Sequence, residues 1–165
     1  MRQWAAGLLI LSAMGCSPPA ASQKGKDMAA PDPARLRESA RLYTAAWCSQ
    51  DPARVASFFA PTGSLKVNDG APAVGREAIT GVARGFMTDF PDMQVLMDDL
   101  VVRGDGAVYK WTLVGTNTGP GGTGRKVHIS GYEEWRLDAA GLILESKGHF
   151  DGADYARQLA GGPSN

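Results

Sequence analysis

The chain has 165 residues, of which 44% are hydrophobic and 21% charged, and 17 basic residues balance 17 acidic ones. This composition is typical of one globular domain and excludes a disordered or fibrous chain. A zero net charge without a basic cluster argues against a nucleic-acid partner, because a phosphate backbone must be neutralised by several Lys and Arg contacts. The two Cys and two His residues lie too far apart for a zinc motif, so the sequence predicts no metal site.

The first residues have the pattern of an export signal. Arg2 supplies a charged start, an apolar run follows over residues 5–11, and small residues precede Cys16. This run is shorter than the roughly 20 residues that a membrane-spanning helix needs. We therefore predict a signal peptide over residues 1–15, rather than a buried N-terminal helix.

The end of this signal resembles the lipobox of bacterial lipoproteins, in which cleavage leaves a lipid-modified cysteine at the new N-terminus. That residue would be Cys16. The resemblance implies a cell-envelope lipoprotein that is exported and anchored to a membrane by its lipid, and a secreted or periplasmic soluble protein is the alternative. Residues 16–31 have hardly any large apolar side chain, so we expect a disordered tether there.

The domain is predicted to span residues 32–165, and its first half has helical patterns. Asp32 and Asp51 each precede a proline, which places a capping side chain before a proline at the first helical position. Apolar residues recur at helical spacing after Asp32 and again before Pro91. The predicted helices run from Asp32 to near Ser49, from Asp51 to before Pro61, and over Ile79–Phe90.

After Pro91 the apolar period changes to two, which indicates strands. The alternation slips phase at Asp98 and Asp99, as a β-bulge would produce. Helices followed by such strands predict an α+β fold, with about three N-terminal helices packed on a curled, mainly antiparallel sheet. The predicted strands are Ser64–Asn68, Met93–Val102, Val108–Leu113, Lys126–Leu137 and Leu142–Phe150, and a final short helix covers Asp151–Leu159.

The last predicted hairpin determines which polar side chains lie together. A four-residue turn over residues 138–141 would pair Leu137 with Leu142 and set Asp151 opposite His128, with His149 beside them. A carboxylate next to an imidazole is suited to general acid–base chemistry. The candidate catalytic residues are therefore Asp151, His128, His149 and Tyr132, and a simply solvated sheet face is the alternative interpretation.

The opposite face of this hairpin is apolar apart from Glu133. A carboxyl group in that position is either a pocket acid with a raised pKa or a paired group, unless the register is wrong. Aromatic residues at the mouth of a cone of helices and sheet often line a ligand pocket, although core packing also explains them. The candidate pocket residues are Tyr43, Trp47, Phe86, Trp111, Glu133 and Trp135.

Six short motifs together resemble the SnoaL-like polyketide cyclase and ester cyclase family, which belongs to the nuclear transport factor 2-like superfamily. They lie at residues 43–47, 74–79, 90–93, 111–116, 124–127 and 150–151, and the match covers about residues 35–160. The resemblance implies a cone-shaped α+β fold, usually dimeric, with an apolar pocket between sheet and helices. The family's cyclases close a ring by an intramolecular aldol step without cofactor or metal, using an aspartate whose position matches Asp151.

Two functions of different class follow. One is a binding domain without catalysis, whose cone pocket holds a small apolar ligand. The other is a cofactor-free enzyme of the cyclase or isomerase type, in which Asp151 is general acid and base on a carbonyl substrate. The closing strand has Glu145-Ser146-Lys147 where the family often has His-Trp after the glutamate, which removes an aromatic wall and a proton partner. A homodimer is the expected assembly.

Overall fold

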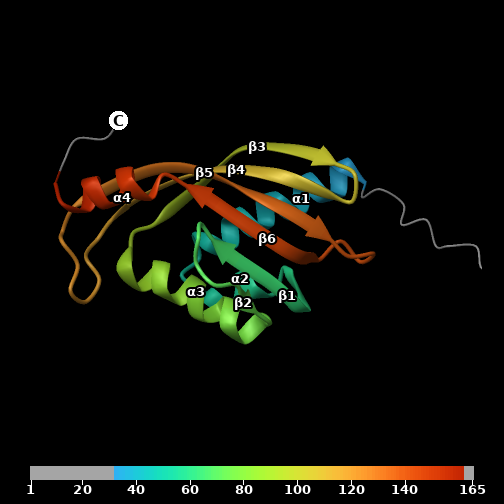
Figure 1. Cartoon of the computed structure of the whole chain (residues 1–165), viewed down its shortest axis with the longest axis horizontal. Coiled ribbons are helices and arrows are strands. Elements are labelled where there is room, and N and C mark those ends of the chain that lie inside the picture. Colours follow the sequence, from blue (N-terminus) through green and yellow to red (C-terminus); the bar gives the residue numbers. More distant parts are fainter. Residues whose placement is uncertain (1–31, 162–165) are drawn as a thin grey trace, which may run out of the picture.

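The computed structural model describes residues 32–161; the predicted signal peptide, Cys16 and the tether lie outside the described residues. Figure 1 shows long, bent strands running above α2 (Pro52–Ala56) and α3 (Arg76–Asp89), with α1 (Pro33–Trp47) behind them. A last helix, α4 (Gly152–Leu159), lies beside one end of the sheet. No helix within residues 32–161 is long and apolar enough to cross a membrane.

The predicted helix starts are confirmed in detail. The Asp32 side chain accepts a hydrogen bond from the backbone N–H of Ala34, and the Asp51 side chain accepts two, from Ala53 and Arg54. Both caps are followed by proline, whose missing N–H costs nothing in the first turn. Helix α3 begins three residues before its apolar stripe, at Arg76, and buries Ile79, Ala83 and Met87 against the core.

Six strands form one mixed sheet in the order β2-β1-β6-β5-β4-β3. All neighbouring pairs are antiparallel except β1 and β6, which are parallel. This sheet, with the helices packed on it, confirms the predicted α+β fold class. The strands are β1 (Phe59–Val67), β2 (Ala73–Val74), β3 (Gln94–Arg103), β4 (Gly106–Thr116), β5 (Lys126–Leu137) and β6 (Ile143–Phe150).

Two details of the strands differ from the prediction, and one agrees. Strand β1 begins at Phe59 instead of Ser64, because the chain turns directly from α2 into the sheet, and the two-residue strand β2 was not predicted. The predicted bulge is confirmed, since the pairing of β3 with β4 shifts register between Met97 and Asp99. The Asp98 carboxylate accepts a hydrogen bond from the Thr112 hydroxyl, which links the edge strand β3 to β4 at the bulge.

The predicted register of the last hairpin is wrong by two residues. Leu137 pairs with Ile143, because the Asp138 carboxylate accepts hydrogen bonds from the N–H groups of both Ala140 and Leu142 and so draws Leu142 into the turn. The next pair is Arg136 with Glu145, which leaves residue 144 as a bulge. A shift of two keeps each side chain on its predicted face along most of the hairpin, but it changes every partner.

Candidate functional site

A pocket opens between the concave face of the sheet and helices α1 and α3. It holds about 530 Å³ of empty space, part of which is open to solvent. Four of the six candidate pocket residues line it, namely Trp47, Phe86, Trp111 and Glu133. The other lining residues are apolar apart from the Tyr109 hydroxyl: Leu65, Val67, Val95, Tyr109, Leu113, Gly148 and Phe150.

Glu133 is the one carboxyl group among these lining residues, and it is buried, with 6% of its surface exposed. The sheet places it between Tyr109 on β4 and Gly148 on β6. Its Oε2 atom accepts hydrogen bonds from Ser146 Oγ at 2.6 Å, from Trp135 Nε1 at 2.8 Å and from the Tyr43 hydroxyl at 3.1 Å. Donors from strands β5 and β6 and from helix α1 therefore hold this carboxyl in one orientation.

Burial raises the pKa of the Glu133 carboxyl above its ordinary value. The hydrogen bonds from Ser146, Trp135 and Tyr43 act in the opposite direction, because they stabilise the charged form. Burial likewise raises the pKa of Tyr43 and of Tyr109, so both hydroxyls stay neutral near neutral pH.

Two polar atoms of pocket residues are left without strong partners, and a third such buried atom, His149 Nε2, lies outside the pocket. Glu133 Oε1 has one long contact, 3.3 Å, with the same Tyr43 hydroxyl that already lies closer to Oε2. The indole N–H of Trp111 is buried and has no hydrogen-bond partner among the described residues. Buried polar groups are normally paired, so an unpaired donor on a residue that lines the pocket is unusual.

Two glycines lie next to pocket residues, and they differ in the space that a side chain would find. A Cβ at Gly131 would lie 2.6 Å from Cζ2 of Trp111 and 2.4 Å from the carbonyl oxygen of His149, so only glycine fits below this indole ring. A Cβ at Gly148 would meet the carbonyl oxygen of Lys66 at 3.4 Å and Cγ of Glu133 at 3.7 Å, which are ordinary contacts. Gly148 therefore keeps space open beside Glu133 without being required by the fold.

The remaining candidate pocket residues, Tyr43 and Trp135, lie behind the wall as hydrogen-bond donors to Glu133. Sequence reasoning did not identify Ser146 and Gly148 as functional, although both fall on the same predicted face as Glu133. Their position on this face is visible in the sequence as alternation with the polar residues of the strand. Which of them contacts Glu133 depends on the register of β5 and β6, and the sequence does not determine that register.

The candidate catalytic residues His128, Tyr132 and His149 lie on the outer face of the sheet. His149 is paired with Tyr132 across the hairpin, and their rings stack with centroids 4.8 Å apart. Its Nε2 atom lies 3.5 Å from a carboxylate oxygen of Glu134. Neither these three residues nor Asp151 lines the pocket in the described part of the chain.

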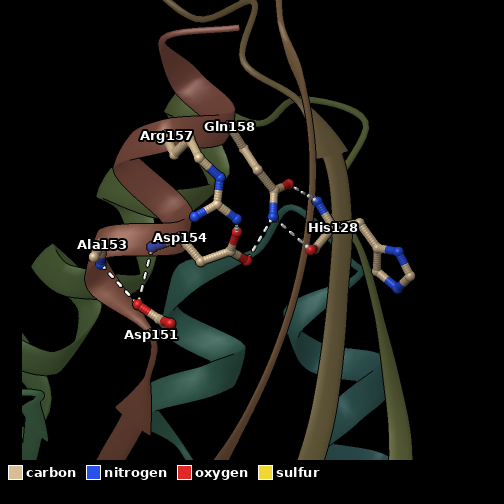
Figure 2. Close-up of polar contacts among 6 residues, drawn as sticks. All are labelled: His128, Asp151, Ala153, Asp154, Arg157 and Gln158. Atoms are coloured by element: carbon tan, nitrogen blue, oxygen red, sulfur yellow. Dashed lines mark hydrogen bonds and ion pairs between the residues drawn. The ribbon is translucent and has the colours of Figure 1, made fainter. Parts of the chain in front are cut away.

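Asp151 is the N-cap of α4, and its carboxylate accepts hydrogen bonds from the N–H groups of Ala153 and Asp154. Figure 2 shows the His128 imidazole directed away from this carboxylate, so the predicted pairing of His128 with Asp151 is wrong. Instead, the Gln158 side chain bonds the backbone of His128 twice, accepting from its N–H at 2.7 Å and donating to its carbonyl at 2.9 Å (Figure 2).

This Gln158 clamp has a simple cause. Strand β6 ends at Phe150, opposite Gly131, so the backbone of β5 at His128 has no strand on that side. The amide of Gln158 supplies one acceptor and one donor in place of a strand. Asp154 orients this amide by accepting from Gln158 Nε2 at 2.8 Å, and it also pairs with Arg157.

The family model described as SnoaL-like polyketide cyclase matches residues 37–159 of the chain. No curated protein matches it. Among solved structures, TsrD from Streptomyces laurentii is 26% identical, with 78% of this chain and 97% of that chain covered and a TM-score of 0.69. A putative SnoaL-like polyketide cyclase from Jannaschia sp. CCS1 is 21% identical, with 81% and 98% covered and a TM-score of 0.70.

A third similar structure is a hypothetical protein from Catenulispora acidiphila with a ketosteroid isomerase-like fold, solved in complex with trimethylamine. It is 20% identical, with 76% of this chain and 94% of that chain covered and a TM-score of 0.68. Within residues 32–161, no group of three or more His, Cys, Asp or Glu side chains is placed to hold a metal ion.

Proposed function

The chain belongs to the SnoaL-like polyketide cyclase family, and from this we propose that its cone pocket binds one small, mainly apolar molecule, with Glu133 as its polar contact. The observation that carries the proposal is the buried Glu133 carboxyl, which has one poorly partnered oxygen in an otherwise apolar wall. An apolar cavity with a few convergent polar groups is the usual form of a small-molecule site.

Two further observations support a ligand. The Trp111 indole N–H lacks a partner, and Gly148 keeps space open that an alanine could fill. Other proteins of this fold have been crystallised with small organic molecules, the C. acidiphila protein with trimethylamine and TerC with polyporic acid.

The proposal is tested with N-phenyl-1-naphthylamine, a neutral apolar dye whose fluorescence rises in a dry site. We expect saturable binding of one dye per chain. Gly148→Ala should weaken binding by about threefold to tenfold, because one buried methyl group excludes ligand volume. The matched control is Gly85→Ala on α3, where a Cβ meets no atom within 4 Å. Equal binding by all three proteins, or no saturable binding by the wild type, would contradict the proposal.

Acid–base catalysis on a carbonyl compound is the second candidate, and the raised pKa of the Glu133 carboxyl favours it. Its test is deuterium exchange at the carbon next to the carbonyl of 2-tetralone, followed by NMR. The family resemblance assigns the proton transfer to Asp151, whereas the pocket assigns it to Glu133. Exchange that is lost in Glu133→Gln and retained in Asp151→Asn supports Glu133, and the reverse pattern supports Asp151. Exchange at the rate of the buffer alone leaves only the binding function.

Export, lipid anchoring at Cys16 and a homodimer remain part of the proposal. The first two rest on the sequence of residues 1–16, and the mass of the mature N-terminus tests them: a diacylated cysteine supports the anchor, and an unmodified one supports a secreted or periplasmic soluble protein. The dimer is supported by three exposed apolar side chains on the outer face of the sheet, Leu96, Val114 and Tyr132.

A further inference from the structure

We propose that the ligand of this pocket is an organic cation, a tertiary or quaternary ammonium group with apolar substituents, held between the Glu133 carboxylate and the aromatic side chains of the wall. The inference rests on the proposed ligand-binding function and specifies the chemical class of the ligand. It depends on three features of the pocket: aromatic faces, an acid without a cationic partner, and donors that favour the charged form of that acid.

The aromatic side chains come from opposite sides of the pocket. Trp47 of α1 and Phe86 of α3 form an edge-to-face pair with centroids 6.1 Å apart. Trp111 of β4 and Phe150 of β6 form a second such pair at 6.2 Å, and Tyr109 also lines the wall. The face of an aromatic ring carries negative charge density and attracts a cation, most strongly where water is excluded. Clusters of aromatic side chains are known to recognise quaternary ammonium groups.

Glu133 has no basic partner in the described part of the chain. None of the residues that line the pocket is Lys, Arg or His, and the groups that bond the carboxylate are the neutral donors Ser146, Trp135 and Tyr43. Three donors to one oxygen favour an ionised carboxylate, whereas burial without a counter-charge opposes it. A cationic ligand resolves this conflict, because it supplies the missing charge beside Oε1.

The buried Trp111 indole N–H, which has no partner among the described residues, is a second polar position that an oxygen atom of the ligand would satisfy. Tyr109 lies opposite Glu133, and Trp111 lies two residues further along β4, so Trp111 and Glu133 are diagonal neighbours on one face of the sheet. Diagonal pairs are separated by about 7–8 Å and are within reach of one small molecule. An ammonium group beside Glu133 and an oxygen near Trp111 would satisfy both polar positions.

Ligand binding should be linked to ionisation of Glu133. Burial raises the pKa of this carboxyl in the free protein, and a bound cation lowers it again, so binding releases a proton and strengthens as pH rises. The titratable groups that face Glu133 are Tyr43 from α1 and Tyr109 from β4, and their raised pKa values keep both neutral over this range.

The experiment compares two molecules of nearly the same shape, choline and 3,3-dimethyl-1-butanol, which has a carbon atom in place of the charged nitrogen. Binding to the wild type is measured by calorimetry at pH 8. We expect choline to bind at least about tenfold more tightly than the alcohol. Glu133→Gln should abolish this preference. The matched control is Glu134→Gln, because Glu134 is the next residue of the same strand and its side chain is exposed.

A second variant keeps the test valid if Glu133→Gln does not fold. Phe86→Leu retains an apolar side chain but removes one aromatic face, so choline should bind about threefold to tenfold more weakly while the alcohol is unaffected. If wild-type protein binds the alcohol as tightly as choline, the cation inference is wrong and the pocket function stands. If neither molecule binds and the naphthylamine dye does not bind either, the proposed function itself fails.

Discussion

Glu133 is the residue on which the chemistry of the pocket depends. Its odd position in an apolar alternation is visible in the sequence, and this was enough to make it a candidate, either as a pocket acid or as a paired group. Its partners were not predictable, because Tyr43 lies 90 residues away and Ser146 reaches it only through the register of β5 and β6. Single residues can thus be identified from pattern, whereas the contacts that set their pKa depend on the folded chain.

The raised pKa of Glu133 predicts a pH dependence of stability. Because the folded state holds the proton more tightly than the unfolded state, the stabilising contribution is complete below the ordinary value of 4.5 and is lost as pH rises through the raised folded-state pKa. The free energy of unfolding of the wild type should fall with pH in this window, by at most about 1.4 kcal/mol per pH unit. Urea denaturation at several pH values measures it.

The control for this slope is Glu133→Gln, which cannot ionise. Hydrogen bonds lower the pKa values of Asp92 and Asp99, so these two groups change the free energy of unfolding with pH in the opposite direction. Subtracting the free energy of unfolding of the variant from that of the wild type removes their contribution, because both proteins contain them. A difference in stability that does not change with pH would mean that Glu133 titrates as an ordinary glutamate.

The two glycines beside the pocket should respond differently to the same substitution. Gly131→Ala should destabilise the protein by about 2 kcal/mol or more, because its Cβ collides with backbone and with the Trp111 ring. Gly148→Ala should leave stability unchanged or raise it by about 0.5 kcal/mol, because its Cβ makes only ordinary contacts. Thermal unfolding of both variants measures the difference, and equal losses would show that Gly148 is required by the fold rather than by the ligand.

At the scale of elements, local signals predicted the structure well and pairing signals did not. The caps Asp32 and Asp51 were readable because the side chain bonds a backbone N–H only two or three residues away. The bulge near Asp98 was readable as a slip of the apolar phase. The predicted register of the last hairpin was wrong because the Asp138 side chain lengthens the turn, and because a bulge follows at residue 144.

The side chain of Gln158 hydrogen-bonds helix α4 to β5, in addition to the packing of Tyr155 on Phe150, so this residue should matter more than its position near the C-terminus indicates. Gln158→Ala leaves the N–H and carbonyl of His128 without partners and should cost about 2–3 kcal/mol. Hydrogen exchange at the amide of His128 should accelerate in parallel. Asp151→Asn is the comparison, because asparagine is an equally good N-cap, and it should change stability by less than about 0.5 kcal/mol. Unchanged protection of His128 in Gln158→Ala would contradict the clamp.

At the scale of the whole molecule, the α+β fold was predictable because the change from helical to alternating periodicity is strong and falls in one place. The parallel pairing of β1 with β6 was not, since it joins segments about 80 residues apart with no shared pattern. The pocket follows from that arrangement: the bent sheet lies over α1 and α3, and residues from five strands and two helices line the cavity. Its position relative to Asp151 could only be read from the structure.

The exposed apolar residues of the outer sheet face predict where a dimer would form. If the proposed dimer forms through this face, Leu96→Glu should give a monomer, because it would bury a charge in the interface. Leu42→Glu is the matched control, since Leu42 is a similarly exposed leucine on α1, away from the sheet face. Light scattering after size-exclusion chromatography measures the mass, and a wild type that is monomeric at all concentrations would remove the dimer from the account.

The pocket around Glu133 is tested most directly by ¹H–¹⁵N NMR spectra recorded during titration with N-phenyl-1-naphthylamine. The indole N–H signals of tryptophan are resolved from the backbone, so Trp111 reports on its own unpaired donor. We predict that the largest shifts occur at the Trp111 indole and at the amide of Gly148. Largest shifts at Tyr132, His149 and Asp151 instead would place the ligand on the outer face of the sheet and contradict the assignment of the pocket as the functional site.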